Sequence, residues 1–563
     1  MGCRKSLFIA LLLTIGVLGC APDAETPARG NDAINSAAIE AARIIDARLL
    51  RQTVAVLAGD EFEGRGPASA GDLKTQSFLS AALDRLGYSP GGEEGSWLQT
   101  FEIVSVTTTA PETWIFTSGS DAIALSYWDE FIVASGVQAP SAMIDDAEVV
   151  FVGYGIRAPE YDWDDYKGLD VSGKVLLFLN NDPDWDRELF EGNRRLYYGR
   201  WSYKYEIAAQ LGAAGAIVIH TTPSAGYPYQ VVQTSWSGPQ FELPAGGEPT
   251  IAVEAWVTEE AARRLVALAG HDLARLVESA RSPTFAPIPL GVTTSLRLET
   301  DLFRVQTANV AGLLEGRDPV LRNEVVVLTA HHDHLGVGEP DDTGDVIYNG
   351  ARDNAAGVAQ ILAVAEALQA LPTPPRRSIL ILFVAAEEQG LLGSAYYALH
   401  PTFEPGRIAA NVNVDGGNIW GRTRDVSFIG YGKSSLDTVV ERAVALQGRT
   451  VRGDQFPDRG YFYRSDQFSF AKIGVPAVYL DDGTDFIGQP EGWGVAQIEN
   501  WEAVRYHQPS DELNDGWNFD GMIEDARLAF YISLTIAEAD AMPTWNAGDE
   551  FEAARLAALA ARR

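Results

Sequence analysis

The chain has 563 residues, 46% of them hydrophobic and 10% aromatic, a composition typical of a folded globular protein. Because this length exceeds what one hydrophobic core usually holds, we expect two domains. The formal net charge of −34 argues against nucleic acid as a partner, since the phosphate backbone would be repelled. The charge identifies no partner by itself, because an acidic surface also keeps an exported protein soluble.

The first twenty residues predict a signal peptide. Arg4 and Lys5 form a basic region, and the apolar run over residues 7–18 is too short to span a membrane. Gly19 and Cys20 then resemble a bacterial lipoprotein cleavage box, so Cys20 is expected to become the lipidated first residue. We therefore expect an exported cell-envelope lipoprotein, in the periplasm or at the outer membrane. An ordinary secretion signal is the alternative.

The mature chain is expected to lack disulfides and to begin with a flexible tether. Cys3 and Cys20 are the only cysteines, which excludes a disulfide framework in the mature chain. Residues 21–35 are rich in Ala, Pro, Asp and Asn and predict a flexible tether. No later window of about 18 apolar residues occurs, so membrane contact is expected only through the lipid at Cys20.

The next segment predicts helices around a glycine-rich break. Residues 39–50 and 73–86 carry apolar side chains at helical spacing. Residues 59–71 separate them and contain too many glycines and charges to continue a helix. This break reads most simply as a solvated turn.

Residues 100–290 have a β-rich texture. A helix is predicted at residues 203–213. Apolar β-prone runs occupy residues 147–152, 174–179, 216–220 and 249–253. Pro, Gly and aromatic clusters separate these runs, which indicates a compact β-rich domain with one or two helices.

From residue 310 onward, near-continuous apolar strands alternate with amphipathic helices. The strands are predicted at residues 324–328, 378–384 and 475–480, and the helices at residues 357–371 and 436–447. Buried strands alternating with helices are typical of an α/β sheet covered on both faces. Such sheets place their chemistry at the loops that leave the strand ends.

The first chemically rich segment ends the strand predicted at residues 324–328. It reads His331, His332, Asp333 and His334. In an extended chain, His331 and Asp333 point the same way, so the carboxylate could orient a metal-bound imidazole. His332 and His334 would share the opposite face, and spacing alone leaves either pair as ligands.

Four further segments carry acids or histidine. Asp353 stands just before a helix, where an N-cap is the simplest interpretation. Glu387 and Glu388 end a hydrophobic strand, and Asp415 ends another. His507 lies in a Pro-containing loop.

Each segment alone has an ordinary structural explanation. Together they supply two histidines and three carboxylates as possible ligands, and Glu387 is a further carboxylate. Mixed nitrogen and oxygen ligands suit zinc, with cobalt or manganese as substitutes. Two metals bridged by one carboxylate form a common hydrolytic arrangement. The pattern therefore predicts a metal-dependent hydrolase.

These motifs, in this order, resemble the M28 family of zinc peptidases. The matching segments are residues 57–66, 325–336, 349–357, 383–394, 411–422 and 506–511. Residues 150–183 and 201–220 look like the protease-associated (PA) domain that some members carry as an insertion. The resemblance implies an α/β fold, a three-layer mixed-sheet zinc-peptidase domain with an inserted β-rich PA domain.

The resemblance also implies domain boundaries. The peptidase domain would be discontinuous, formed by residues 36–105 and 295–545. The PA-like insertion would cover residues 106–294, and residues 546–563 would form a C-terminal helical tail.

Residue roles follow from the same resemblance. The implied metal ligands are His331 and Asp415 on one zinc, Glu388 and His507 on the other, and Asp353 bridging both. Glu387 would be the general base, Asp333 would orient His331, and Tyr463 would steady the oxyanion, with a core tyrosine as the rival interpretation of Tyr463. A cis peptide bond is expected at Asp353–Asn354.

The implied function is a dinuclear zinc exopeptidase, an aminopeptidase in which Glu387 activates a metal-bridging water. A carboxypeptidase is an alternative and would need a cationic pocket, for which Arg65, Arg352 and Arg464 are candidates. A glutaminyl cyclase and a non-catalytic peptidase-like binding protein are further alternatives, although no ligand or base is missing. The expected partner is a peptide substrate.

The sequence departs from the family pattern in three ways. Arg352 stands where many members have another acid, and Gln467 replaces a histidine that is not a ligand. Gly416 and Gly417 follow Asp415 where a bulky apolar residue is frequent. None of these changes removes a ligand or the base, and the first and third bear on the shape of the substrate pocket.

Overall fold

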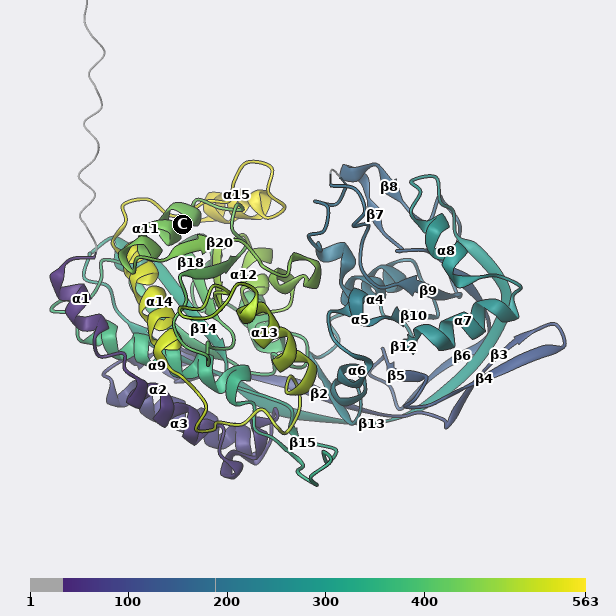
Figure 1. Ribbon diagram of the computed structural model, residues 1–563, viewed down its shortest axis with the longest axis horizontal. Helices are drawn as coiled ribbons and strands as arrows, with labels where there is room; N and C mark the ends of the chain where they lie inside the picture. The colour runs from purple at the N-terminus through teal and green to yellow at the C-terminus, as the bar shows by residue number, and fades with distance from the viewer. Residues whose placement is uncertain (1–33, 188, 563) are drawn as a thin grey trace, which may run out of the picture.

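The computed structural model describes residues 34–187 and 189–562, which form two lobes (Figure 1). The predicted signal peptide with Cys20, and almost all of the predicted tether, lie outside the described residues. Among the described helices, none combines the length and the apolarity that crossing a bilayer requires. We call residues 34–109 and 300–562 the first lobe and residues 110–299 the second lobe.

A mixed sheet forms the centre of the first lobe. In spatial order its strands are β13 (Ile288–Leu314), β17 (Ser378–Val384), β14 (Val325–His331), β18 (Ile408–Val414), β21 (Ala477–Asp481), β19 (Asp425–Ile429) and β20 (Thr450–Arg452). The four strands from β17 to β21 run parallel. β13 is antiparallel to β17, and β19 is antiparallel to β21 but parallel to β20. Of the three strands predicted in this region, β17 is confirmed with the same bounds, and β14 and β21 are confirmed to within three residues at their ends.

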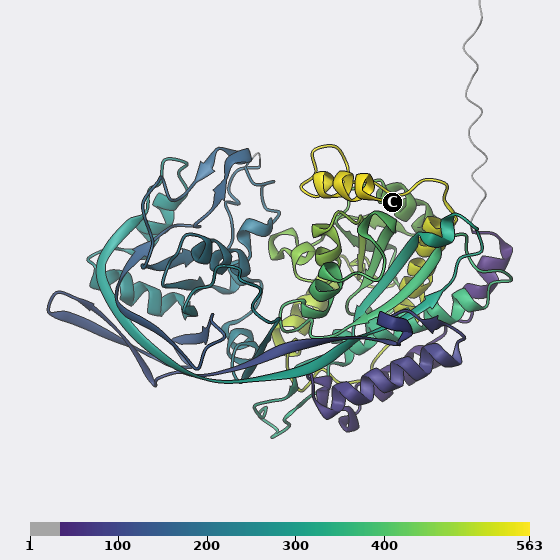
Figure 2. The same ribbon diagram turned by 180° about the vertical axis from the view of Figure 1, so that it is seen from behind.

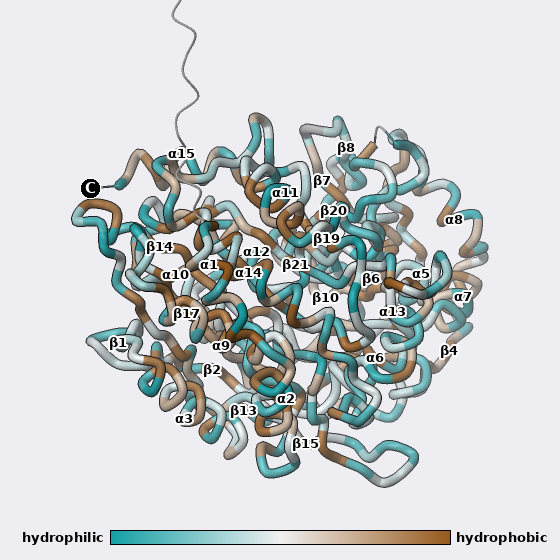
Figure 3. Tube along the Cα trace, turned by 60° about the vertical axis from the view of Figure 1, so that its left-hand side comes forward, coloured by the Kyte–Doolittle hydropathy of each residue, from teal (hydrophilic) through white to brown (hydrophobic). Residues whose placement is uncertain are grey.

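Side-chain alternation explains how helices cover both faces of this sheet. Val326 and Leu328 of β14 pack into the cluster that contains α9 (Ala356–Gln369) and α14 (Asp520–Glu538). Val325 and Val327 face the opposite cluster, which includes Tyr397 of α10 (Leu392–Leu399) and Phe470 of α12 (Gln467–Lys472). A strand buried on both faces is the middle of three layers, which confirms the α/β fold class. Apolar stretches lie along these inner elements, and hydrophilic stretches lie on outer loops (Figure 3).

The N-terminal helices lie against α9. They are α1 (Ser36–Ala42), α2 (Ala47–Leu57) and α3 (Ala70–Arg85). The helix predicted at residues 39–50 is wrong as one element, because the Asp46 carboxylate accepts from the backbone N–H of Leu49 at 2.7 Å and begins α2 as an N-cap. The remaining helices of this lobe are α11 (Leu436–Leu446), α13 (Trp493–Val504) and α15 (Glu552–Ala561).

The second lobe has its own sheet and core. The strands follow β13 in the order β6 (Ser141–Phe151), β9 (Val175–Leu179), β10 (Gly215–His220), β12 (Val253–Thr258) and β5 (Phe131–Ser135). The helices include α4 (Trp201–Gln210), α6 (Tyr229–Ser235), α7 (Glu259–Leu268) and α8 (Leu273–Ala280). The strand predicted at residues 249–253 is misplaced, because β12 begins only at Val253. Pro249 lacks the N–H that a strand between two neighbours must donate.

Two long strands join the lobes. β2 (Leu98–Thr109) pairs with β13 from Val310 opposite Leu98 to Glu299 opposite Thr109, while the first part of β13 pairs with β6 in the second lobe. The ribbon runs along one side of the whole molecule (Figure 2). The expected domain boundaries after residues 105 and 294 therefore fall inside strands, and the assignment of the second lobe as a PA domain stays a prediction.

The C-terminal segment is packed against the first lobe. Arg555 of α15 is 1% exposed and donates to the carbonyl of Ile408, the first residue of β18, at 2.9 Å. Trp545 and Phe551 belong to a buried aromatic cluster. The predicted helical tail is thus an integral part of this lobe.

Candidate metal centre

The predicted ligands converge at one edge of the central sheet. His331 is the last residue of β14, Glu387 and Glu388 follow β17, and Asp415 follows β18. Because these three strands are parallel, their carboxyl ends meet at the same edge. Asp353 joins them from the turn that precedes α9.

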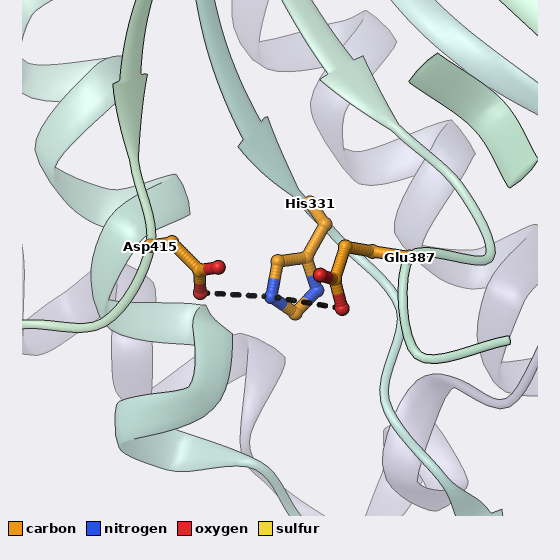
Figure 4. Close-up of side chains that lie close together, drawn as sticks. All are labelled: His331, Glu387 and Asp415. Carbon is orange, nitrogen blue, oxygen red and sulfur yellow. Dashed lines mark hydrogen bonds and ion pairs between the residues drawn. The ribbon is translucent and has the colours of Figure 1, made fainter. Parts of the chain in front are cut away.

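The His331 ring is the centre of one group. Its Nε2 lies 3.1 Å from Asp415 Oδ1, 3.2 Å from Asp353 Oδ1 and 3.9 Å from Glu387 Oε2. The carboxylates of Asp415 and Glu387 lie on either side of the ring (Figure 4). His331 is 1% exposed, so water screens these contacts weakly.

His507 is the centre of the other group. Its Nε2 lies 2.9 Å from Glu388 Oε2 and 3.5 Å from Asp353 Oδ2. The two oxygens of Asp353 therefore face two different imidazoles. A carboxylate in this position has the arrangement that a bridging ligand needs. The cis peptide bond expected at Asp353–Asn354 is present.

The donor set fits a pair of zinc ions. Ligand atoms of His331, Asp353 and Glu388 lie within 4.8 Å of one another, as do those of His331, Glu387 and Asp415. His507 Nε2 is buried and, although it lies 2.9 Å from Glu388 Oε2, it forms no hydrogen bond of suitable geometry within the described part of the chain. Imidazole nitrogens and carboxylate oxygens are typical zinc ligands, and so many carboxylates in one buried site are costly without compensating positive charge.

The two adjacent glutamates differ in their electrostatics. Burial, followed by the carboxylates of Asp415 and Glu388, raises the pKa of Glu387 well above its usual range, although His331 opposes the shift. For Glu388, burial and Asp353 act upward, but His507 and His334 prevail and lower the pKa to about 2. One glutamate is thus held as a carboxylate, while its neighbour has an elevated proton affinity.

Asp333 holds a different partner from the one expected. Its Oδ1 lies 3.7 Å from His331 Nδ1, which is too long for a hydrogen bond. The carboxylate instead accepts from the backbone N–H groups of Glu387, at 3.0 Å, and Glu388, at 3.3 Å. Asp333 therefore fixes the segment that carries the two glutamates.

Of the two histidines expected on the face opposite His331, one points away from the site and the other lies in it. His332 turns away, with Nδ1 3.2 Å from the carbonyl of Val384 and Nε2 3.5 Å from Asp72. His334 is also at the site, because its Nδ1 lies 2.6 Å from Glu388 Oε1. Simple alternation does not apply here, since β14 ends at His331 and the next residues leave the extended conformation.

Tyr463 does not lie where the resemblance placed it. Its hydroxyl donates to Glu550 at 2.8 Å, and its ring packs in an aromatic cluster with Phe462 and Phe468. It is absent from the lining of the cavities beside the ligands, whereas Tyr506 lines both. The expected role of Tyr463 is corrected in favour of the core-tyrosine interpretation, because its ring packs among Phe462 and Phe468 and its hydroxyl is bonded to Glu550.

Several supporting residues were not singled out from the sequence. Ser465 donates to Asp415 Oδ2 at 2.6 Å. Asp511 accepts from the backbone N–H groups of Arg352 and Asp353, both at about 3.1 Å or less. Both residues lie in segments already marked by an acid or a histidine, but a hydroxyl or a second carboxylate has no spacing signal of its own.

Arg65 overturns the interpretation of residues 59–71 as a solvated turn. The side chain is 1% exposed and donates to four backbone carbonyls. The acceptors are Leu57, His332, Asn349 and Gly350, at 2.6–2.9 Å. The break therefore ties the loop after β14 to the turn that carries Asp353.

Two cavities adjoin the ligands. One of about 100 Å³ is lined by Asp353, Asp415 and Trp501, and the other, of about 290 Å³, is lined by Trp201 and Trp236 of the second lobe. Both are also lined by Glu387, Glu388, Tyr227, Arg464 and Tyr506. The site thus lies between the lobes and is contacted from both.

The three candidate arginines differ in availability. Arg65 is fully engaged with backbone carbonyls, as described above. Arg352 pairs with Asp482 at 2.9 Å and lies over the Trp501 ring, 4.2 Å from its centroid. Arg464 lines both cavities and donates to the Tyr506 hydroxyl at 3.2 Å. Of the three, Arg464 is placed to meet a substrate.

Comparison with known sequences gives partial matches to peptidases. Aminopeptidase YwaD of Bacillus subtilis (strain 168) is 26% identical over 228 residues, covering 38% of this chain and 42% of the relative. The probable leucine aminopeptidase 2 of Aspergillus fumigatus is 26% identical over 269 residues, covering 45% and 49% respectively. The matched region thus spans less than half the length of these curated relatives.

Comparison with solved structures supports the fold. The aminopeptidase from Aneurinibacillus sp. strain AM-1 superposes with a TM-score of 0.52 at 18% identity, covering 88% of this chain and 95% of that one. Residues 309–530, which contain all five predicted ligands, match the sequence profile described as Peptidase family M28. Over residues 309–530, the chain is therefore similar to peptidase family M28.

Proposed function

We propose that the chain is a dinuclear zinc exopeptidase that releases N-terminal residues from peptides. The observation that carries the proposal is the position of Asp353, whose two carboxylate oxygens face His331 and His507. Glu387 lies beside this pair with an elevated proton affinity. Relatives named as aminopeptidases support the choice of reaction.

The ligands divide into two sets in this proposal. His331 and Asp415 would hold one zinc, Glu388 and His507 would hold the other, and Asp353 would be shared by both. Bound zinc would supply Lewis acidity, polarising the scissile carbonyl and making a water molecule more acidic. Co²⁺ and Mn²⁺ are possible substitutes, since they accept the same donors.

Glu387 is the proton carrier of the proposed reaction. Its carboxylate accepts a proton from the attacking water and then delivers it to the leaving amine. Its position 3.9 Å from His331 Nε2 places it next to the proposed ligands without making it one of them. The neighbouring Glu388 is kept ionised and serves as a ligand instead.

Tyr506 takes the position that Tyr463 does not fill. Its hydroxyl accepts a hydrogen bond from Arg464 at 3.2 Å, and both side chains line the cavities. A phenol that accepts from a guanidinium still has its own proton to donate. Tyr506 is therefore suited to stabilise negative charge on the carbonyl oxygen as it develops.

A carboxypeptidase is the second candidate because of Arg464. This guanidinium is the group that could bind the terminal carboxylate of a peptide. The second lobe covers the site on one side, with Gly226 and Tyr227 lining the smaller cavity. Such a cover favours chain ends over internal bonds, and it fits either exopeptidase.

We also propose export and anchoring through a lipid on Cys20, by the cleavage-box pattern of the sequence. Labelling of the expressed chain with a radioactive fatty acid tests this part. The wild-type chain should be labelled and a Cys20→Ser variant should not.

Metal analysis together with a substrate panel tests the main proposal. About two zinc ions per chain, with chelator-sensitive release from aminoacyl p-nitroanilides, is the expected result. Two zinc ions with release only from peptides that have a free C-terminus would select the carboxypeptidase. A protein that binds no zinc would overturn the proposed centre.

A further inference from the structure

A residue of the second lobe contacts a predicted metal ligand directly. Ser235 is the last residue of α6, and its Oγ lies 2.9 Å from Nδ1 of His507, a hydrogen-bonding distance. The two residues are separated by 272 positions in the sequence. No other described side chain is hydrogen-bonded to this ring nitrogen.

The chemistry of an imidazole ligand gives this contact a role. Nε2 of His507 faces Glu388 and Asp353, so it is the nitrogen that would bind metal. In a neutral ring the proton must then be on Nδ1, where it needs an acceptor. The Ser235 hydroxyl supplies that acceptor, which fixes both the tautomer and the direction of the ring.

His507 has little local support of its own. Its φ is +57°, a left-handed conformation that is unusual for a residue with a side chain. The ring lies close to the Tyr506 ring, with centroids 3.9 Å apart, which restricts its plane but offers no acceptor to Nδ1. The direction in which Nδ1 and Nε2 point within the plane of the ring therefore depends on Ser235.

Other contacts seat the second lobe around this point. Gln230 of α6 donates to Gln508 at 3.5 Å, directly beside His507. The backbone N–H of Phe241 donates to Gln389 at 3.2 Å, next to the paired glutamates. The first contact holds α6 beside the loop of His507, and the second holds the strand that follows α6 beside the paired glutamates.

We infer that Ser235 is a positioning residue through which the second lobe completes the metal centre. The metal held by Glu388 and His507 binds tightly only when α6 is docked, so that loss of this contact weakens one metal and leaves the other in place. The inference rests on the proposed dinuclear centre and adds a role for the second lobe.

A Ser235→Ala variant tests the inference by metal affinity rather than by turnover. Competition with a chromogenic chelator should show one metal weakened by about 10–100-fold and the other unchanged, the range typical for loss of an outer-shell partner. The visible spectrum of the cobalt-loaded variant should change for that metal alone. Ser235→Thr keeps the hydroxyl and should restore much of the affinity.

Thr234→Ala is the matched control. Its hydroxyl bonds back to Gln230 of the same helix at 3.1 Å, so the variant removes a hydroxyl from α6 without touching His507. Equal affinity for both metals in Ser235→Ala and wild type would overturn the inference while leaving the dinuclear centre intact. Failure of the wild type to bind two metals would instead overturn the proposed centre, and the inference with it.

Discussion

The Asp333 carboxylate accepts a hydrogen bond from the backbone N–H of Glu387 at 3.0 Å, and a second from Glu388 at 3.3 Å. Asp333 is 0% exposed, and both bonds are therefore formed away from water. The end of β14 thus fixes the backbone of the segment after β17. This contact places the proposed base relative to His331.

We expect Asp333→Asn to lower kcat by about 10–100-fold while both metals stay bound, because the two N–H groups bond to different carboxylate oxygens and the amide nitrogen that replaces one of them cannot accept. Metal analysis and steady-state kinetics on the same preparation measure both quantities. Asp342→Asn, at an exposed position of the next loop, is the control. Loss of a metal before loss of turnover would show that Asp333 acts through His331 instead.

Glu387→Gln should retain about two metals and lose turnover by roughly 10²–10⁴-fold, the usual contribution of a positioned general base. The amide has the same shape but cannot accept a proton from water. Metal content and single-turnover rates are the measurements. A variant with wild-type kcat would exclude Glu387 as the proton carrier.

The two tyrosines should behave differently. Tyr506→Phe removes a hydroxyl from the cavities and should lower kcat by about 10–100-fold, within the range known for one oxyanion donor or somewhat below it. Tyr463→Phe removes only the bond to Glu550 and should leave kcat within about twofold. The reverse result would restore the role that the family resemblance gave to Tyr463.

Arg65 should be sensitive even to a conservative change. Arg65→Lys cannot reach four carbonyls with one ammonium group, and buried carbonyls are left without donors. We expect a loss of about 2–4 kcal/mol in the free energy of unfolding. Urea titration measures it, with Arg48→Lys on an exposed face of α2 as the control. A loss below about 0.5 kcal/mol would contradict the anchoring role.

Glu254, at the larger cavity, should make stability depend on pH. Burial, with smaller contributions from Glu242 and Glu206, raises its pKa from 4.5 to about 8. The folded state therefore binds a proton that the unfolded state has released, and stability falls as pH rises from about 4.5 through 8. Below about pH 4.5, protonated Glu254 makes its full contribution to the free energy of unfolding.

Glu254→Gln stays neutral throughout and should lose less stability than the wild type between pH 5 and about 8. Urea unfolding at several pH values measures the slope. Glu248→Gln, an exposed acid of the same lobe, should match the wild type. Parallel pH profiles for Glu254→Gln and wild type would contradict a raised pKa.

Local sequence patterns were sufficient for the framework of the site. His331, Glu388 and Asp415 each terminate or follow an apolar strand, and parallel strands bring their ends together. Hydrophobic runs also located β14, β17 and β21 closely. These features are local, so a short window of sequence contains the information.

Contacts between distant segments could not be predicted in this way. Ser235 meets His507 only because the second lobe folds back over the site, and no spacing rule connects them. His334 reaches Glu388 because β14 ends at His331, so the alternation expected over residues 331–334 does not continue. The full length of β13 could not be predicted from the sequence, because burial alternates along its first part whereas its second part is continuously buried.

The continuous pairing of β2 with β13 limits how the two lobes can move. A lobe attached by loose linkers can swivel freely, whereas this one can change its angle only by bending or twisting a hydrogen-bonded ladder. Moving the lobes apart would therefore strain the β2–β13 ladder, and relief of that strain would favour the arrangement in which α6 contacts His507.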